Sequence, residues 1–377
     1  MSTAPTELPE VAQLLVELCE IPSPSYQEAD IAARARRELA ALGCEVIEDD
    51  VGARIGAGCG NLLGRLPATA PGTPVLLCAH LDTVPVAAPV EVELREDGTL
   101  ANRHEAILGG DDKAAIAAML VAVRQLLRDG GPHAGIEILL TPCEEVGLRG
   151  AAGFDASVLA AQLGFVFDHA GPIGQIVMSA PWHKRITATF FGVAAHAGMQ
   201  PEHGHSAIAA AAHAIAQMPL GRIDEQTTAN IGIIAGGEAT NVVAAQCQVI
   251  AEARSREPEL LAGQITRMVD AMTAAAIAGG CDLECRVETY YAGYRLRRSD
   301  PQVALAERAL RRVGITPRHV PGGGGSDVNA LLRQGLPAVN LCNAMVDVHT
   351  AAESIAVRDL ETMVGVTRAI LAEAVER

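Results

Sequence analysis

Hydrophobic positions along the chain follow two patterns, one typical of helices and one typical of buried strands. Apolar residues recur at helical spacing in residues 7–20 and 28–42, and the second segment stops at Gly43, a natural helix terminator. Short continuous apolar runs occur at residues 75–79, 136–140, 165–167 and 338–341. Runs of this length, bounded by turn residues, predict strands buried on both faces, as in a parallel sheet under helices.

Alanine-rich helical segments separate these strands, at residues 114–127, 301–313 and 358–374. The segment at 301 has Asp300 as its expected N-cap, Pro301 at its first position and Gly314 just past its end. This alternation of strand and helix predicts an α/β fold.

The middle of the chain has a different order of elements. From about Trp182, strands are expected at 185–191, 228–234, 246–254 and 282–289, with helices at 206–218 and 259–278. They form an α+β unit of about 110 residues, which is large enough for a separate domain. Since the α/β pattern resumes after Tyr294, we predict a discontinuous outer domain (1–180 and 292–377) and an inserted domain (181–291).

Composition narrows the class of protein. The 377 residues suggest two domains, and 49% hydrophobic residues with 3% aromatics predict an aliphatic core. The net charge of −16 argues against binding to nucleic acid or to an anionic membrane, and the sequence contains no apolar run long enough to span a bilayer. Nine scattered cysteines without a CxxC motif, and a polar N-terminus without a basic signal region, predict a cytoplasmic protein.

Polar residues follow each of the four predicted strands directly. In open α/β sheets, ligands bind beyond the carboxyl ends of strands, so these side chains could converge on one site. The residues are His80, Asp82, Glu144, Glu145, Asp168, His169, Asp347 and His349. An oxygen-rich set with imidazole is typical of a site for zinc, cobalt or manganese.

Individual motifs refine this hypothesis. His80 and Asp82 are either residues of an ordinary surface loop or a metal ligand and the carboxylate that orients it, because a ligating histidine usually donates its other ring N–H to a carboxylate. Asp111 either caps the following helix or, next to two glycines, bridges two cations. Glu144 and Glu145 are either a solvated acidic turn or a general base beside a metal ligand.

Two residues of the inserted segment are further candidates. His196 could donate a hydrogen bond to an oxyanion, although a lone histidine is more often an ordinary loop residue. Arg254 could clamp a substrate carboxylate, or it could form a surface salt bridge.

Several segments together carry a family resemblance. They are LLCAHLDTVPV, ILGGDDKAAIAAML, LLTPCEEVG, FDHAG, AAHAGMQPEHGHSAI, EATNVVA, EARS, GGGGSDVNAL and VHTAAESI. In this order, and over nearly the whole chain, they resemble the M20 family of co-catalytic metallopeptidases. LGGDDKA, TPCEEVG and AHAGMQPEHGHSAI resemble its peptidase T-like branch most, although Cys143 stands where that branch usually has Asp.

The resemblance implies a site with two divalent ions, zinc in the first place, with cobalt or manganese as alternatives. His80 and Asp168 would bind one ion, Glu145 and His349 the other, and Asp111 would bridge both. Asp82 would orient His80, and Glu144 would be the general base for a metal-activated water. The Asp111–Asp112 peptide is expected to be cis.

The resemblance also implies the surroundings of this site. Substrate contacts would come from His196, Asn241, Arg254, Gly324 and Ser326. The outer domain would be zinc-peptidase-like, with a mixed, mostly parallel sheet flanked by helices. The inserted domain would be a two-layer sandwich of four strands and two helices that acts as a lid and joins a homodimer.

We therefore expect a hydrolase that cleaves short peptides, most similar to a tripeptide aminopeptidase. Two alternatives remain open. One is an N-acyl-amino-acid amidohydrolase or carboxypeptidase of the same family, acting on N-acyl amino acids or peptides. The other is a metal-binding protein without catalytic activity.

Overall fold

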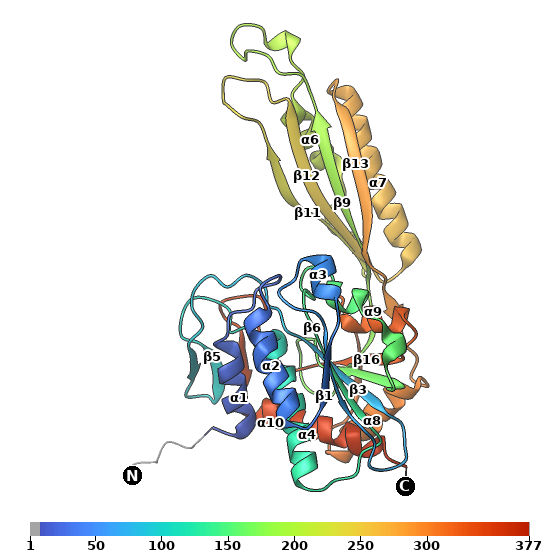
Figure 1. Ribbon diagram of the computed structural model, residues 1–377. Helices are drawn as coiled ribbons and strands as arrows, with labels where there is room; N and C mark the ends of the chain where they lie inside the picture. The colour runs from blue at the N-terminus through green and yellow to red at the C-terminus, as the bar shows by residue number, and fades with distance from the viewer. Residues whose placement is uncertain (1–7, 377) are drawn as a thin grey trace. The chain divides into compact units, whose positions relative to one another are not determined.

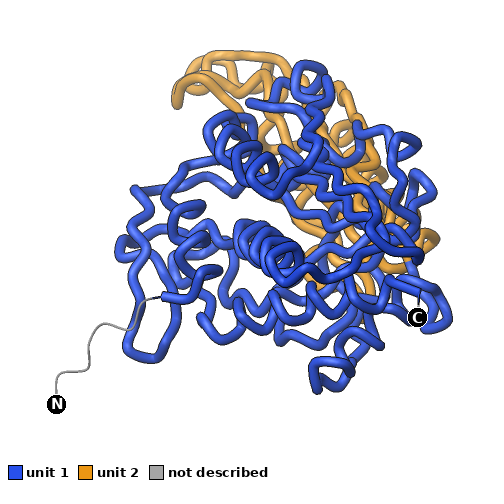
Figure 2. The backbone as a smooth tube through the Cα atoms, turned by 60° about the horizontal axis from the view of Figure 1, so that its bottom comes forward, with its two compact units in different colours: residues 1–179, 295–377 blue, residues 180–294 orange. Residues whose placement is uncertain are grey.

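The computed structural model describes residues 8–376, so the predicted start of the first helix at residue 7 lies outside the described residues. The chain divides into two compact units, which Figure 2 colours separately. Unit 1 comprises residues 1–179 and 295–377, and unit 2 comprises residues 180–294.

Unit 1 alternates strands and helices along the chain (Figure 1). Its helices are α1 (Glu10–Cys19), α2 (Ala29–Ala41), α3 (Val51–Ile55), α4 (Gly110–Arg128), α5 (Arg149–Gly153), the 3-10 turn η1 (Ala156–Val158), α8 (Pro301–Arg312), α9 (Asp327–Arg333) and α10 (Val357–Glu373). Its strands are β1 (Glu45–Glu48), β2 (Leu62–Leu66), β3 (Val75–His80), β4 (Val92–Leu94), β5 (Thr99–Asn102), β6 (Ile136–Thr141), β7 (Leu163–Val166), β8 (Gln175–Ala180), β14 (Tyr294–Arg295), β15 (Arg318–Pro321), β16 (Ala338–Leu341) and β17 (Ser354–Ala356).

The main sheet has nine strands in the order β1-β2-β6-β3-β7-β16-β8-β14, with β15 paired to β8. The four neighbours β6, β3, β7 and β16 run parallel, and the pairs β1–β2, β2–β6 and β16–β8 are antiparallel. Strands β3, β6, β7 and β16 are buried along their whole length. The predicted mixed, mostly parallel sheet flanked by helices is confirmed.

One local expectation needs correction, and a second is confirmed in position but not in its hydrogen bond. The strand expected at 165–167 is β7, Leu163–Val166, because Gly164 interrupts the apolar run and hides its first half. Asp300 occupies the N-cap position of α8, but its carboxylate accepts a hydrogen bond from the backbone N–H of Arg297 (2.9 Å), and the structure shows no side-chain cap there.

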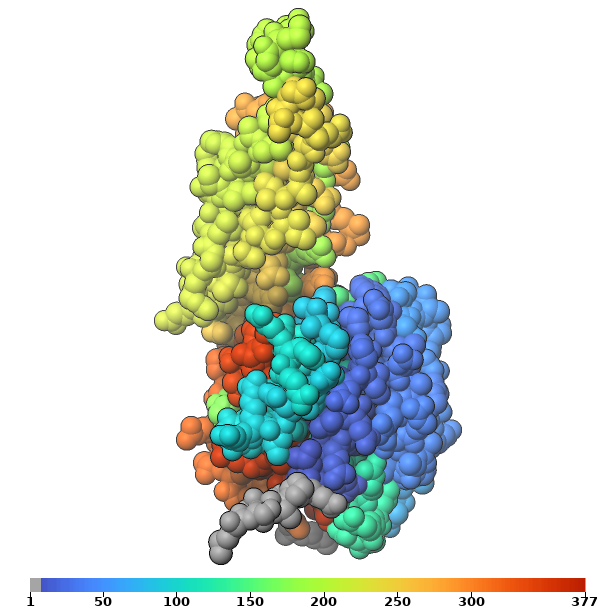
Figure 3. Space-filling model, turned by 90° about the vertical axis from the view of Figure 1, so that its left-hand side faces the viewer, coloured from blue at the N-terminus to red at the C-terminus, as the bar shows by residue number. Residues whose placement is uncertain are grey.

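A separate three-stranded sheet, β17-β5-β4, lies beside α1 on the surface of unit 1 (Figure 3, cyan and dark blue). The backbone N–H of Val92 in β4 donates to Glu20 Oε1, just past the end of α1 (3.4 Å). Strand β17 leads directly into α10, and the segment between β16 and β17 connects the two sheets of the unit.

Unit 2 is an antiparallel sheet in the order β10-β11-β12-β9-β13 with two helices. Its elements are β9 (Trp182–Phe191), η2 (Pro201–His203), α6 (Ala207–Gln217), β10 (Gly221–Arg222), β11 (Thr227–Gly236), β12 (Gln246–Ser255), α7 (Pro258–Ala278) and β13 (Asp282–Tyr291). Inward residues of β9 and β12 pack with α6 and α7 around Phe190, Met268 and Met272. Alanines at the helix faces allow this core to form with few aromatic side chains.

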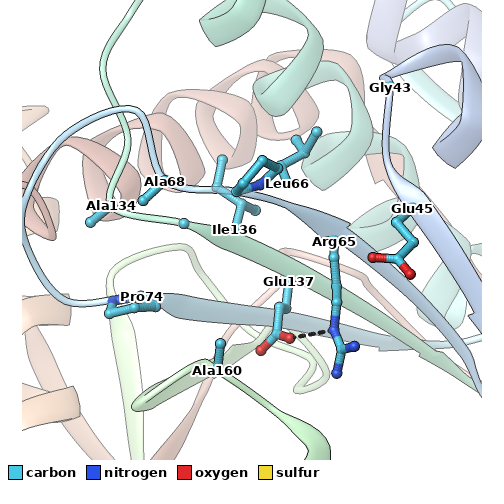
Figure 4. A pocket seen from close by; sticks show the side chains of 12 residues that line it. Gly43, Glu45, Arg65, Leu66, Ala68, Pro74, Ala134, Ile136, Glu137 and Ala160 are labelled. Carbon is cyan, nitrogen blue, oxygen red and sulfur yellow. Dashed lines mark hydrogen bonds and ion pairs between the residues drawn. The ribbon is translucent and has the colours of Figure 1, made fainter.

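A cavity of about 490 Å³ opens at the amino ends of β3 and β6 (Figure 4). Its wall is largely apolar, and Arg65 of β2 pairs with Glu137 of β6 beside it (2.8 Å). The predicted site residues lie at the opposite ends of these strands, the carboxyl ends. Among the described residues, no helix is long and apolar enough to cross a membrane.

Candidate metal centre

The carboxyl ends of four parallel strands carry the predicted ligands. His80 is the last residue of β3, Glu144 and Glu145 follow β6, and Asp168 follows β7. Because β6, β3, β7 and β16 are parallel neighbours, their carboxyl ends share one edge of the sheet. The loop after β16 brings His349 to the same edge, where its ring approaches Glu145.

Two groups of ligand atoms share Asp111. Around His80, the Nε2 atom lies 3.9 Å from Asp111 Oδ1 and 4.0 Å from Asp168 Oδ1. Around His349, the Nε2 atom lies 3.3 Å from Asp111 Oδ2 and 2.9 Å from Glu145 Oε1. Each oxygen of Asp111 therefore faces a different group. The Asp111–Asp112 peptide is cis, as the resemblance implied.

A third possible ligand group contains His80, Glu144 and Glu145. The geometry therefore allows Glu144 to be either a ligand or a free base. The side chain of Glu144 is buried. Burial raises its pKa well above the ordinary value, and the negative charge of Asp168 raises that pKa further.

Asp82 supports the site in two ways. Its carboxylate accepts hydrogen bonds from the backbone N–H groups of Glu144 (2.8 Å) and Glu145 (3.2 Å) and from the hydroxyl of Ser25 (2.7 Å). His80 Nδ1 lies 2.9 Å from the backbone carbonyl of Asp82 and 3.6 Å from its carboxylate. Asp82 thus fixes the turn that carries both glutamates, and its backbone holds the imidazole.

The electrostatics of the site favour bound cations. Burial raises the pKa of Asp112 and Asp168 well above the ordinary value, and the charge of Asp111 adds to both shifts. Burial by itself would lower the pKa of His80, but nearby carboxylates, Asp82 first, outweigh it and raise that pKa. The pKa of His349 is raised to about 10 by its hydrogen bonds to Asp111 and Glu145.

The donor set fits divalent metal ions. Both carboxylate oxygens of the buried Asp112 lack a hydrogen-bond partner among the described residues. Carboxylates outnumber imidazoles in each of the three possible ligand groups. Such crowded, desolvated negative charge is costly unless cations offset it, and oxygen with some imidazole suits zinc, cobalt or manganese.

A family model described as peptidase family M20/M25/M40 matches residues 76–373. The chain belongs to this family. The YqjE protein of Bacillus subtilis strain 168 is 38% identical over 359 residues, 95% of this chain and 96% of that protein.

Two solved structures resemble this M20 enzyme over nearly its whole length. Aminopeptidase PepT from Bacillus cereus ATCC 10987 is 38% identical with a TM-score of 0.85, covering 97% of this chain and 98% of that one. A tripeptidase from Staphylococcus aureus Mu50 is 34% identical with a TM-score of 0.89, covering 96% and 97%. The predicted metallopeptidase of the peptidase T-like branch is confirmed.

Three predicted substrate residues lie in unit 2 of this M20 enzyme. His196 Nδ1 accepts hydrogen bonds from the backbone N–H groups of Gly198 (3.2 Å) and Met199 (3.1 Å), so its proton resides on Nε2. Asn241 is its neighbour, because the N–H of Ala197 donates to the Asn241 carbonyl (2.9 Å).

Arg254 already has a partner within unit 2. Its guanidinium makes two hydrogen bonds to the carboxylate of Glu252, at 3.0 and 3.1 Å. His183 Nε2 lies 3.0 Å from the same carboxylate. The contact with His183 and the charge of Arg254 together lower the pKa of Glu252 to about 2. A substrate carboxylate would have to compete with Glu252 for Arg254.

The other two predicted residues precede α9 in unit 1. Ser326 is the N-cap of α9, is buried, and its N–H donates to Asn329 Oδ1 (3.0 Å). A Cβ built on Gly324 meets no atom within 4 Å, so the described residues give no steric reason for glycine there.

Asp327, Glu353 and Glu28 are buried carboxylates near the predicted ligands that were not singled out from the sequence. Asp327 accepts a hydrogen bond from the Thr141 hydroxyl (2.5 Å), and burial raises its pKa to about 6. Glu353 accepts bonds from the loop that carries Asp111. Asp327 and Glu353 lie within segments that carry the family resemblance, which is a signal for their importance; Glu28 lies within none of them.

Glu28 holds the start of the glutamate turn. Its carboxylate accepts hydrogen bonds from the N–H groups of Tyr26 (2.8 Å), Gly58 (2.8 Å) and Cys143 (3.2 Å), and from the Cys143 thiol (3.1 Å). Cys143 has a positive φ of 55° directly before Glu144. A thiol in place of the usual aspartate thus provides a donor to Glu28, where a second carboxylate would repel it.

Proposed function

We propose that this M20 enzyme is an aminotripeptidase that removes the first residue from unblocked tripeptides with the help of two divalent ions, zinc in the first place. The observation that carries the proposal is Asp111, which offers one oxygen to each of two ligand groups beside the buried Glu144. The full-length similarity to an aminopeptidase and a tripeptidase supports the choice of substrate.

The ligands of unit 1 would divide between two ions. His80 and Asp168 would hold one ion, Glu145 and His349 the other, and Asp111 both. When bound, the ions would supply Lewis-acid chemistry, polarising the scissile carbonyl and making water more acidic.

Glu144 would move the proton of the reaction. Its carboxylate would take a proton from the attacking water and pass it to the leaving amine, so that one residue serves as base and then as acid. Burial raises the pKa of Glu144 well above its ordinary value, which makes its carboxylate a stronger base. The hydrogen bond from its backbone N–H to Asp82 would keep the side chain in place during both steps.

Residues outside the metal centre would bind the peptide. The Nε2–H of His196 would donate to the oxyanion, and Asn241 and Arg254 would contact the substrate. Gly324 and Ser326 would line its pocket. Unit 2, whose four long strands and two helices form two layers, would act as a lid.

We further propose a homodimer formed through unit 2. Among the described residues, β10 covers two residues of β11, so much of β11 presents an open edge. Ile233 (51% exposed) and Ile234 (49% exposed) lie on that strand. Open edges and exposed apolar side chains favour association with a second chain.

Replacing Ile233 and Ile234 together by Glu should turn the dimer into a monomer in sedimentation experiments and abolish peptidase activity. Ile277→Glu is the matched control, because Ile277 on α7 is 75% exposed and lies outside this edge. A fully active monomer would refute the role of the dimer.

The substrate proposal is tested by amine release from unblocked di-, tri- and tetrapeptides beside their N-acetylated counterparts. We expect cleavage of free-amine tripeptides at least tenfold faster than of the other peptides. Zinc, cobalt or manganese should support this cleavage, and a chelator should abolish it. Preference for the acetylated set would overturn the aminotripeptidase and indicate an N-acyl-amino-acid amidohydrolase.

A further inference from the structure

The segment that carries His349 has an unfavourable backbone. Between β16 and β17, the non-glycine residues Ala344, Asp347 and His349 have φ values of 63°, 51° and 66°. Such left-handed conformations persist only where neighbouring structure holds them. The position of the His349 ring is therefore not fixed by its own backbone preference and needs support from other contacts.

Glu353 provides a long-range contact of this kind. Glu353 is 1% exposed, and both of its carboxylate oxygens accept hydrogen bonds from the backbone at the start of α4. Oε2 accepts the N–H of Gly109 (2.9 Å), and Oε1 accepts the N–H of Asp111 (3.1 Å). The N–H of Glu353 itself donates to the carbonyl of Thr350 (3.1 Å), and this bond closes the turn that directly follows His349.

The two segments also pack closely. A Cβ on Gly110 would lie 2.6 Å from the terminal methyl of Met345, which belongs to the same segment as His349. Gly109 has a φ of +71°, which favours glycine, and its carbonyl contacts the Cys19 thiol (3.6 Å). The two glycines before Asp111 thus let its loop approach the His349 segment and the carboxylate of Glu353.

We propose that Glu353 is a positioning residue that fixes Asp111 and His349 relative to each other and thereby sets the affinity of the ion held by Asp111, Glu145 and His349. The inference rests on the ligand set of the proposed function. It does not depend on which peptide the enzyme cleaves. Glu353 acts through the backbone N–H of Asp111 and through the turn that directly follows His349.

The test is zinc titration of the metal-free enzyme against a competing chelator, with Glu353→Gln as the variant. The amide keeps the size of the side chain, but its NH2 group must face one of two N–H donors, so one hydrogen bond is lost. We expect the zinc ion that the His349→Ala variant loses to bind at least tenfold less tightly, and the other ion to bind within about threefold of wild type. Hydrogen exchange of residues 342–353 should also become faster in the metal-free variant.

Glu137→Gln is the matched control. Glu137 is also a buried carboxylate with two partners, Arg65 and the N–H of Ala161, but it lies beside the cavity at the amino ends of the strands. The Glu137→Gln variant should bind both zinc ions as tightly as the wild type does. If Glu353→Gln does not fold, Glu353→Asp, which is one methylene shorter and keeps the charge, should give the same selective loss.

Unchanged binding of both ions in a Glu353 variant, or equal weakening of both, would overturn the inference. A wild-type enzyme that binds fewer than two ions would refute the ligand set itself, and the inference with it. A wild-type enzyme that binds two ions but cleaves no tripeptide would refute the proposed substrate, and the comparison of the Glu353 variants would still decide the inference.

Discussion

Glu144→Gln should lower kcat for tripeptides by roughly 10²–10⁴-fold, the usual contribution of a positioned general base. The amide has the shape of the carboxylate but cannot take a proton from water. The hydrogen bond between the Glu144 N–H and Asp82 involves the backbone, so the substitution leaves it intact. Metal content, measured by elemental analysis, should stay at the wild-type value.

Glu145→Gln is the matched control for this variant. The two glutamates are neighbours, and both backbone N–H groups bind Asp82, but the carboxylate of Glu145 lies 2.9 Å from His349 Nε2. The Glu145→Gln enzyme should therefore lose metal as well as activity. Loss of metal in Glu144→Gln would show that Glu144 is a metal ligand, as the group of His80, Glu144 and Glu145 allows. Near-wild-type turnover in this variant would show that Glu144 is not the general base.

Asp111→Ala should abolish the binding of both ions at micromolar free zinc. Asp111 is shared by the His80 and His349 groups, so its removal takes an oxygen ligand from each. Loss of metal should cost several kcal/mol of transition-state stabilisation, or roughly a thousandfold in kcat/KM.

His349→Ala is the comparison that tests the shared role. His349 belongs to one of the two groups, so its removal should leave the ion held by His80 and Asp168 in place. Zinc titration of the two variants side by side measures the difference. An Asp111→Ala enzyme that still binds two ions would contradict a bridging role for Asp111.

Much of the fold followed from local patterns. Buried strands such as β3, β6 and β16 were visible because strands buried on both faces are continuously apolar. Strand β1, Glu45–Glu48, and strand β2, Leu62–Leu66, were not predicted. Strand β1 is mostly exposed at the sheet edge, and Gly64 and Arg65 interrupt the apolar run of β2. Neither strand therefore has a clear pattern of apolar and polar residues.

The sequence by itself determined which residue types follow each buried strand, and the parallel sheet then brought His80, Glu145 and Asp168 to one edge. The tertiary structure alone decided how that edge is held. Asp82 binds the backbone N–H groups of the glutamate turn, and Glu353 reaches Asp111 across 242 residues of chain. Such hydrogen bonds depend on how distant loops approach each other, and they leave no periodic pattern along the sequence.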